Sequence, residues 1–370
     1  MTSSSDNLTE LLANLERGES LPARWYTDPS IAERELARIF RKSWIYVGPL
    51  AHLASLGDYI TGHAGGVPVV VVRGEAGLAG FVNVCRHRRH EVMKGRGNAR
   101  MMMCGYHAWT YDLAGQLRRA PRSEGAPDFR LEDFPLLPIR VETLGPLVFV
   151  NLDEEAPPVQ SFFGPVLDII AKSGIVFDEL EHHSRAEGQS PANWKAMLEN
   201  YLECYHCAIA HPGFSAAIDV RPDQYKYESR EWFSTQIGPV KQPAGGRGKP
   251  PPYDVTGAVG ESQYHFLWPN LTISINPGFP NLSAELWIPE GPGMTRGFSD
   301  RFFGRGVTQE FAQSLIAFNE QVAAEDDLLT DSVQRGLMGG LPDRGRFLPN
   351  AEPLVLDFQR KIIRAIAGEN

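Results

Sequence analysis

Cysteine, positive charge and long apolar runs are all scarce in this sequence. Four cysteines in 370 residues are too few for a disulfide framework, so they favour a reducing cytoplasm and metal-binding or catalytic roles. The lack of any run of eighteen apolar residues argues against a membrane span, and the N-terminus lacks the apolar stretch of a secretory signal. Lysine and arginine number 36 against 45 aspartates and glutamates, which argues against nucleic acid as the main partner. We therefore expect a cytoplasmic globular protein.

The pattern of apolar residues changes twice along the chain, which predicts an α+β fold with two domains. Residues 30–43 have apolar residues at helical spacing, within an N-terminal helical segment, 1–43, that we expect to pack on the larger domain, 154–370. Residues 44–153 contain short β-branched runs separated by Gly and Pro, which predict a small antiparallel β domain. Residues 154–370 alternate helical stretches with strand-like runs, which predict helices flanking an antiparallel sheet. The Gly- and Pro-rich stretch 242–260 predicts a loop or lid.

Two cysteines and two histidines stand in a regular pattern in the β domain. Cys85-x-His87 is followed, after sixteen residues, by Cys104-x-x-His107, so each half pairs one thiolate with one imidazole. A zinc finger would place two cysteines in one half. Mixed halves let the cysteines bind one metal and the histidines another, which is the ligation of a Rieske [2Fe–2S] cluster. A structural zinc site or unrelated core residues are the alternatives, and His90 falls outside the spacing.

These residues and their surroundings resemble a known family. CRHR and CGYHAWTY, followed by a larger α+β domain, resemble the terminal oxygenase α subunits of Rieske non-haem iron oxygenases over almost the whole chain. The resemblance implies an enzyme with a Rieske [2Fe–2S] cluster, a mononuclear Fe(II) and dioxygen as co-substrate. It also implies electrons from a separate NAD(P)H-dependent reductase or ferredoxin, and a head-to-tail homotrimer, with or without a small β subunit.

The mononuclear iron site of that family has a counterpart in residues 193–213. Iron that activates dioxygen favours two imidazoles and one carboxylate. His206 and His211 match the family motif E-x-Y-H-x4-H, so the resemblance assigns them as iron ligands; two ordinary histidines near a helix end are the alternative. Residues 193–206 predict one continuous helix, and Pro212 ends helical structure at His211.

Cys204 and Cys207 form a C-x-x-C in the same segment. Such a pair can be a dithiol redox site or part of a zinc knuckle. Because we predict both inside a helix and away from its N-terminus, nothing is expected to lower their pKa. We interpret them as small buried apolar residues outside the site.

The carboxylate ligand has to come from another part of the chain. Residues 321–337 predict a helix that contains three adjacent acids, and such a run usually marks a solvated face. The resembled family has an acidic ligand eight residues before a Gln in a similar helix. This places the third ligand at Asp326, eight residues before Gln334, with Asp327 as the alternate.

Glu203 and Asn200 precede the first of these histidines. In the resembled family an acid at the position of Glu203 links the mononuclear iron of one subunit to a Rieske histidine of its neighbour. Ring-hydroxylating members usually have Asp here, whereas a Glu resembles the branch that acts on carnitine-like and betaine-like quaternary amines. Asn200 matches a family asparagine near the iron, with a surface amide as the alternative.

The resemblance implies O2-dependent hydroxylation of a small organic substrate. The reaction is either aromatic ring hydroxylation or oxidative N-demethylation of a quaternary amine. A Rieske-type electron-transfer protein and a zinc-stabilised binding module are the alternative functions. Aromatic and apolar residues on the C-terminal strands are candidate pocket walls, namely Phe266, Trp268, Ile273, Phe279 and Trp287. Three arginines are candidates to neutralise a substrate carboxylate, with surface solvation as the alternative for each, namely Arg296, Arg301 and Arg305.

Overall fold

The computed structural model describes residues 7–242 and 250–368, which form two compact units. The smaller unit is Phe40–Phe162, and the larger unit comprises the rest of the described chain. The N-terminal helices therefore belong to the same unit as the C-terminal part. The loop predicted for 242–260 lies partly outside the described residues. Among these residues, no helix combines the length and the apolar character that crossing a bilayer requires.

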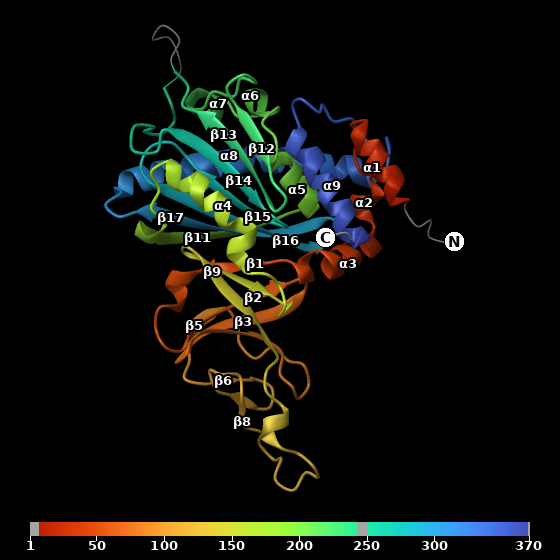
Figure 1. The fold of residues 1–370 in the computed structure, drawn as a ribbon, viewed down its shortest axis with the longest axis vertical. Helices are drawn as coiled ribbons and strands as arrows, with labels where there is room; N and C mark the ends of the chain where they lie inside the picture. The colour runs from red at the N-terminus through yellow and green to blue at the C-terminus, as the bar shows by residue number, and fades with distance from the viewer. Residues whose placement is uncertain (1–6, 243–249, 369–370) are drawn as a thin grey trace. The chain divides into compact units, whose positions relative to one another are not determined.

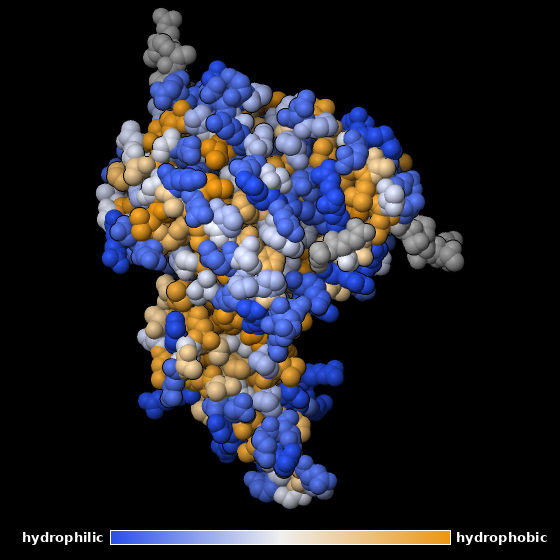
Figure 2. All heavy atoms as spheres, in the orientation of Figure 1, coloured by the Kyte–Doolittle hydropathy of each residue, from blue (hydrophilic) through white to orange (hydrophobic). Residues whose placement is uncertain are grey.

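The smaller unit consists of antiparallel sheets (Figure 1). Its strands are β1 (Ile45–Pro49), β2 (Asp58–Ala64), β3 (Val67–Gly74), β4 (Gly77–Val82), β5 (Arg96–Asn98), β6 (Met102–Met103), β7 (Thr110–Tyr111), β8 (Leu117–Arg119), β9 (Pro138–Leu144) and β10 (Leu147–Asn151). One sheet has the order β1-β10-β9-β4-β3-β2-β5 and the other the order β6-β7-β8. In β3 the four consecutive valines from Val69 to Val72 are all buried, as expected of a short apolar run in a central strand. Figure 2 shows apolar side chains gathered over the larger sheet of this unit.

The larger unit is built on one antiparallel sheet. Its strands are β11 (Leu180–Ser190), β12 (Lys226–Ser229), β13 (Phe233–Pro239), β14 (Glu261–Leu267), β15 (Leu271–Ile275), β16 (Asn281–Gly291) and β17 (Met294–Gly304). They have the order β11-β17-β16-β15-β14-β13-β12. Side chains alternate between the two faces of each strand, so the register of β16 and β17 decides which residues share a face.

Helices cover both faces of this sheet, with α4 on one face and α5, α8 and α9 on the other (Figure 1). The helices are α1 (Leu8–Glu16), α2 (Arg24–Thr27), α3 (Pro29–Arg38), α4 (Val159–Lys172), α5 (Trp194–Tyr201), α6 (Cys207–Ala210), α7 (Phe214–Ala217), α8 (Gln309–Gly339) and α9 (Pro353–Ala367). The helix predicted for 30–43 is α3, which ends earlier and is followed by the 3-10 turn Phe40–Lys42. The long α8 begins at the N-cap Thr308 and ends at Gly340, whose φ of 68° is left-handed.

Two buried polar contacts hold α5 against its neighbours. Glu35 in α3 accepts hydrogen bonds from Lys195 Nζ (2.6 Å) and from Trp194 Nε1 (2.8 Å). Gln334 Oε1 in α8 accepts a bond from the backbone N–H of Asn193 (2.9 Å), which is the N-cap of α5. Both contacts are in the interior, so the segment that follows α5 is fixed relative to α8.

The prediction of one continuous helix over residues 193–206 is wrong. Helix α5 ends at Tyr201, and α6 begins only at Cys207. Side chains explain the break, because Glu203 Oε2 accepts the backbone N–H groups of Tyr205 and His206. These donors are therefore bonded to a carboxylate instead of to helix carbonyls.

The interpretation of Cys204 and Cys207 as small buried apolar residues inside a helix is only partly right. The structure joins them in a disulfide, although both are buried as expected. Because α5 ends before them, they lie in the turn between two helices instead of inside one. The backbone N–H of Cys204 donates to the Tyr227 hydroxyl (3.3 Å), which anchors this turn to β12.

Candidate metal centres and the adjoining cavity

Two loops with the same closing hydrogen bond carry the predicted cluster ligands. Cys85 N–H donates to the His90 carbonyl and Cys104 N–H donates to the Trp109 carbonyl, both at 2.8 Å. The residue just before each acceptor has a left-handed backbone, with φ values of 59° and 57°. The sequence therefore folds two separate C/H motifs into one repeated local geometry.

The two sulfurs lie side by side in the interior. Cys85 and Cys104 are unbonded and each is only 2% exposed. Burial raises the pKa of the Cys104 thiol, and the neighbouring Cys85 adds to this, while the backbone N–H groups of Tyr106 and His107 oppose the rise. Backbone N–H groups aimed at a sulfur stabilise its thiolate form.

The two histidines lie at the surface beside these sulfurs. The rings of His87 and His107 are 4.6 Å apart between centroids, and both residues are exposed. His87 stacks on Trp109 (5.1 Å) and His107 lies against Tyr106 (3.9 Å). Paired buried sulfurs and paired exposed imidazoles fit the donor set of a Rieske cluster, with the imidazole side open to the surroundings.

Tyr111 is a contact residue that the sequence interpretation missed. Its hydroxyl accepts the Arg86 N–H (3.0 Å) and lies 3.4 Å from Cys85 Sγ. Because one lone pair already accepts from the backbone, the O–H is free to donate to the sulfur. The signal for this contact was the place of Tyr111 in the chain, because it follows the second motif closely. It is buried at the end of β7. His90, which falls outside the motif spacing, has its Nδ1 3.8 Å from Cys104 Sγ.

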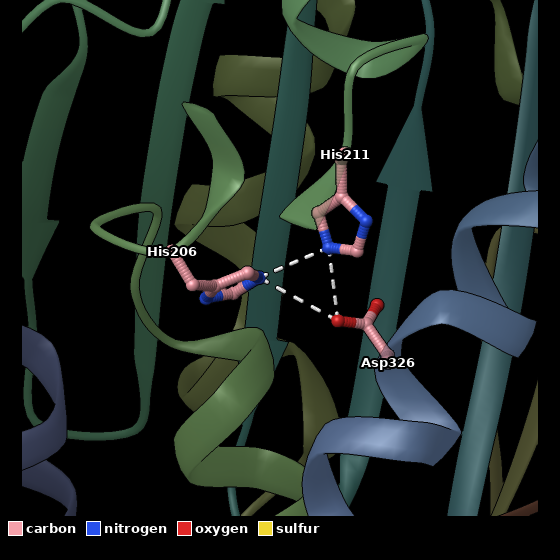
Figure 3. A group of neighbouring side chains, drawn as sticks. All are labelled: His206, His211 and Asp326. Atoms are coloured by element: carbon pink, nitrogen blue, oxygen red, sulfur yellow. Dashed lines mark hydrogen bonds and ion pairs between the residues drawn. The ribbon is translucent and has the colours of Figure 1, made fainter. Parts of the chain in front are cut away.

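The larger unit brings His206, His211 and Asp326 together (Figure 3). The Nε2 atoms of the two histidines are 3.1 Å apart, and Asp326 Oδ1 lies 3.0 Å from His211 Nε2 and 3.5 Å from His206 Nε2. Ligands about 2.1 Å from a metal at right angles are separated by about 3.0 Å. The three atoms therefore fit adjacent positions around one divalent metal ion, and two imidazoles with one carboxylate are the donor set that suits Fe(II).

The outward nitrogen of each histidine is held by a glutamate. His206 Nδ1 contacts Glu203 Oε1, and His211 Nδ1 lies 2.7 Å from Glu325 Oε2. Such carboxylates fix the tautomer of a ligating histidine and direct its Nε2 toward the metal. Glu203 was named from the resemblance, whereas the role of Glu325 was missed, because an acid in a charge run gives no signal of its own.

Burial, hydrogen bonds and neighbouring charges shift the pKa values of the residues in this group. Burial lowers the tendency of His206 to protonate, but hydrogen bonds with Asp326 and Glu203 outweigh it and raise its pKa to about 9. Burial also acts on Asp326, whose pKa is nevertheless lowered by the two histidines. For Asp327, burial and the neighbouring Asp326 raise the pKa. A carboxylate aimed at both Nε2 atoms makes Asp326 the better candidate ligand of the two.

A cavity of about 420 Å³ adjoins the three residues. The side chains of His206, His211 and Asp326 lie in its wall, and Asn200 and Glu203 line it as well. Its volume lies in the range usual for sites of small molecules. The residues that the sequence interpretation proposed as iron ligands, together with Asn200 and Glu203, are therefore all found at this cavity.

The candidate pocket walls were mostly misplaced. Of the five, Trp287 lines the cavity. Phe266 and Trp268 pack against Phe358 of α9, and Phe279 packs against Phe311. The cavity walls come instead from other aromatic residues, namely Tyr201, Phe214, Tyr225, Tyr264, Phe298 and Phe318. The residue pattern predicted the strands, but it does not show which part of a sheet face a helix covers.

Comparisons with known proteins match both units. The family "Rieske [2Fe-2S] domain" matches residues 43–135, and the family "Ring hydroxylating alpha subunit (catalytic domain)" matches residues 177–368. The carnitine monooxygenase oxygenase subunit of Acinetobacter pittii is 32% identical over 349 residues, which is 93% of this chain and 92% of that protein. The chloroplastic choline monooxygenase of Arabidopsis thaliana is 31% identical over 356 residues, covering 92% of this chain and 81% of the relative.

Solved structures are similar over nearly the whole chain. A quaternary ammonium Rieske monooxygenase in complex with L-carnitine superposes with a TM-score of 0.82 at 30% identity, covering 96% of this chain and 98% of the other. Naphthalene 1,2-dioxygenase from Rhodococcus sp. gives a TM-score of 0.80 at 20% identity, covering 98% of each chain, and shares the fold.

Proposed function

Because the chain belongs to the family of ring-hydroxylating oxygenase α subunits with a Rieske domain, we propose that it is a monooxygenase of quaternary ammonium compounds. It is the terminal oxygenase component, with a [2Fe–2S] cluster and a mononuclear iron, and it uses dioxygen. Its electrons come from a separate reductase or ferredoxin, and its substrate is a small organic molecule. The proposal narrows this substrate to a cation whose nitrogen carries methyl groups.

The composition of the cavity wall carries the proposal. Aromatic rings such as Tyr201 and Tyr264 line it, and so do acidic side chains such as Glu285. Aromatic faces attract quaternary ammonium groups through the ring quadrupole, and carboxylates add charge attraction that burial strengthens. A neutral arene would gain from the rings but nothing from the charge of the acidic side chains. Glu203, in place of the Asp usual in ring-hydroxylating members, supports the same choice.

The residues that would hold the metals follow from the geometry above. We assign Cys85, His87, Cys104 and His107 to the cluster, and His206, His211 and Asp326 to the mononuclear iron. When bound, the iron supplies activation of dioxygen, so that one oxygen atom enters a C–H bond and two electrons and two protons convert the other to water.

The chain's own side chains orient the two partners of this reaction. Glu203 and Glu325 hold the histidines with Nε2 toward the cavity, and the aromatic wall holds the ammonium group beside them. Hydroxylation at a carbon next to nitrogen gives a product in which the C–N bond breaks. The nitrogen leaves as an amine with the bonding electron pair, and the carbon becomes a carbonyl group.

We further propose a head-to-tail homotrimer. Tyr205 and Ile209 lie on either side of His206 and are 61% and 88% exposed, and exposed apolar side chains beside a functional segment are typical of an interface. In a ring, Glu203 of one subunit would meet a cluster histidine of the next. Analytical ultracentrifugation of the purified protein tests the trimer, and Ile209→Asp should shift it toward smaller species. A cytoplasmic location stays a prediction.

Glu203→Gln tests the electron route. Glutamine keeps the shape but loses the charge that holds His206 Nδ1, so we expect both metals to stay bound and electron delivery to slow by about tenfold or more. Single-turnover oxidation of the cluster measures this directly. Glu228→Gln, at an exposed site paired with Arg230, is the matched control. Loss of iron in E203Q would instead assign Glu203 to metal retention.

A substrate panel tests the reaction. Choline, γ-butyrobetaine and a simple aromatic acid are offered to the reconstituted enzyme with a surrogate reductase, and oxygen uptake is recorded with the products. Release of trimethylamine or formaldehyde coupled to oxygen uptake supports the proposal, and the amine identifies which carbon is attacked. Turnover of the aromatic acid alone would replace it with ring hydroxylation.

A further inference from the structure

The cavity has a single strong cation among its many acids. Among the described lining residues, Arg301 is the one lysine or arginine. The acidic lining residues are Glu187, Glu203, Glu285, Glu320, Asp326 and Asp327. A cavity that only had to bind a cationic substrate would gain nothing from a guanidinium, so Arg301 calls for a specific partner.

Strand register places Arg301 at the cavity. On the paired strands β16 and β17, Glu285 lies opposite Ser299 and Ser283 lies opposite Arg301. These four positions alternate with residues of the other face, so Arg301 and Glu285 share the face that lines the cavity.

The other two candidate arginines differ from Arg301. The side chain of Arg301 is 12% exposed, whereas that of Arg305 is 71% exposed and pairs with Glu181. Arg296 pairs with Glu290 and is absent from the cavity wall. Arg305 is thus a solvated surface residue, whereas Arg301 is not.

The partner that Arg301 has in this structure is a replaceable one. Arg301 Nη2 donates to Glu320 Oε1 (2.9 Å), and this glutamate in α8 has a side chain that is 58% exposed. A guanidinium offers five N–H donors arranged to fit a carboxylate. Glu320 therefore occupies, from the solvent side, one edge of a carboxylate-binding group that faces the cavity.

We propose that Arg301 binds the carboxylate of a zwitterionic substrate, in place of Glu320. The inference rests on the quaternary ammonium function proposed above and adds that the substrate also carries an acid group. Exchange of one carboxylate for another keeps the guanidinium paired, so the cost of desolvating it is offset by the new pair.

The order of charges along the wall agrees with this assignment. Glu285 is partly buried, and its carboxylate is attracted by Arg301, is repelled by Asp326 and accepts a hydrogen bond from Ser299 (3.2 Å). Glu285 is thus close enough to interact both with the guanidinium and with the proposed iron ligand Asp326. A substrate with its carboxylate on Arg301 and its ammonium near Glu285 would present the carbon beside nitrogen to the three-residue site.

The test compares one substrate with its own methyl ester. γ-Butyrobetaine and γ-butyrobetaine methyl ester share the trimethylammonium group and the chain, but the ester lacks the negative charge. Binding of each to the metal-loaded enzyme is measured by calorimetry without oxygen. Wild type should bind the acid more tightly, and Arg301→Gln should weaken acid binding by about tenfold or more while changing ester binding little. Arg301→Lys should keep part of the preference, and Arg305→Gln should keep all of it.

A second variant has the opposite expected effect and changes an exposed residue. Glu320→Gln removes the competing carboxylate, so we expect acid binding to tighten by about twofold to fivefold, with ester binding unchanged. Equal losses for acid and ester in R301Q would show a purely structural role and overturn the inference, as would a wild type without preference. Those results leave trimethylammonium turnover in place, whereas a wild type that binds and oxidises neither compound overturns the proposed function itself.

Discussion

The two proposed metal sites of this chain are built in opposite ways. The cluster site comes from two loops with the same hydrogen bond and the same left-handed residue, at positions 85–90 and 104–109. The mononuclear site combines a turn after α5 with one position in α8, and His211 and Asp326 are 115 residues apart in sequence. A local motif can carry its own geometry, whereas a dispersed site depends on every contact that holds its helices in place.

His206→Ala should separate the two sites most strongly. Removing a ligand should lower turnover by more than about 100-fold, because loss of a contact outside the ligand set already costs 10- to 100-fold. The cluster should keep its absorption and its EPR signal on reduction. Turnover assays and spectra on one preparation measure both, with His183→Ala as the control, since His183 is exposed and its hydrogen-bond partner is the neighbouring Ser184. A colourless H206A protein would contradict two independent sites.

Cys104→Ser is the converse experiment. Serine is a poor ligand for the cluster, so we expect the sulfide and the colour to be lost while about one iron per chain stays in the larger unit. Metal and acid-labile sulfide analysis checks this. His90→Ala is the matched control, because His90 lies near the Cys104 sulfur without belonging to the proposed ligands. Equal loss of both metals in C104S would mean that the sites are coupled in folding.

Glu35→Ala tests whether the dispersed site depends on distant contacts. It leaves the fully buried Lys195 without its partner, and breaking a buried ion pair in this way costs about 3–5 kcal/mol. We expect the unfolding of the larger unit to shift to lower denaturant while the cluster spectrum persists. Glu33→Ala, at an exposed position of the same helix, should change stability by less than about 0.5 kcal/mol. An unchanged midpoint for E35A would remove this contact from the support of the site.

Tyr111→Phe should have the smallest effect. It removes a hydrogen bond to Cys85 Sγ that favours the reduced cluster, so the reduction potential should fall by about 40 mV, since one such bond is worth about 1 kcal/mol and a one-electron couple changes by 59 mV per tenfold. Spectroelectrochemical titration measures the potential. Tyr106→Phe, whose side chain is exposed, should leave it unchanged. A rise in the reduction potential of Y111F would contradict a hydrogen bond from the Tyr111 hydroxyl to the cluster-bound sulfur.

The contrast also explains which interpretations succeeded. The family matches confirm the α+β fold class and the Rieske oxygenase function. Both could be predicted because they follow from short motifs and strand patterns. The helix through 193–206 failed because Glu203 bonds to backbone N–H groups and breaks it. The Cys204–Cys207 disulfide was missed for the same reason, since the turn was not foreseen.

The sequence alone determined the local chemistry: the two Cys/His motifs, the paired histidines before Pro212 and the acids of α8. Only the tertiary structure decided that Asp326 faces both histidines and that Arg301 and Glu285 share one cavity wall. Residue type and spacing fix what a short segment can bind. Which distant side chains meet is set by helix packing and strand register, where a shift of one residue turns a side chain to the opposite face.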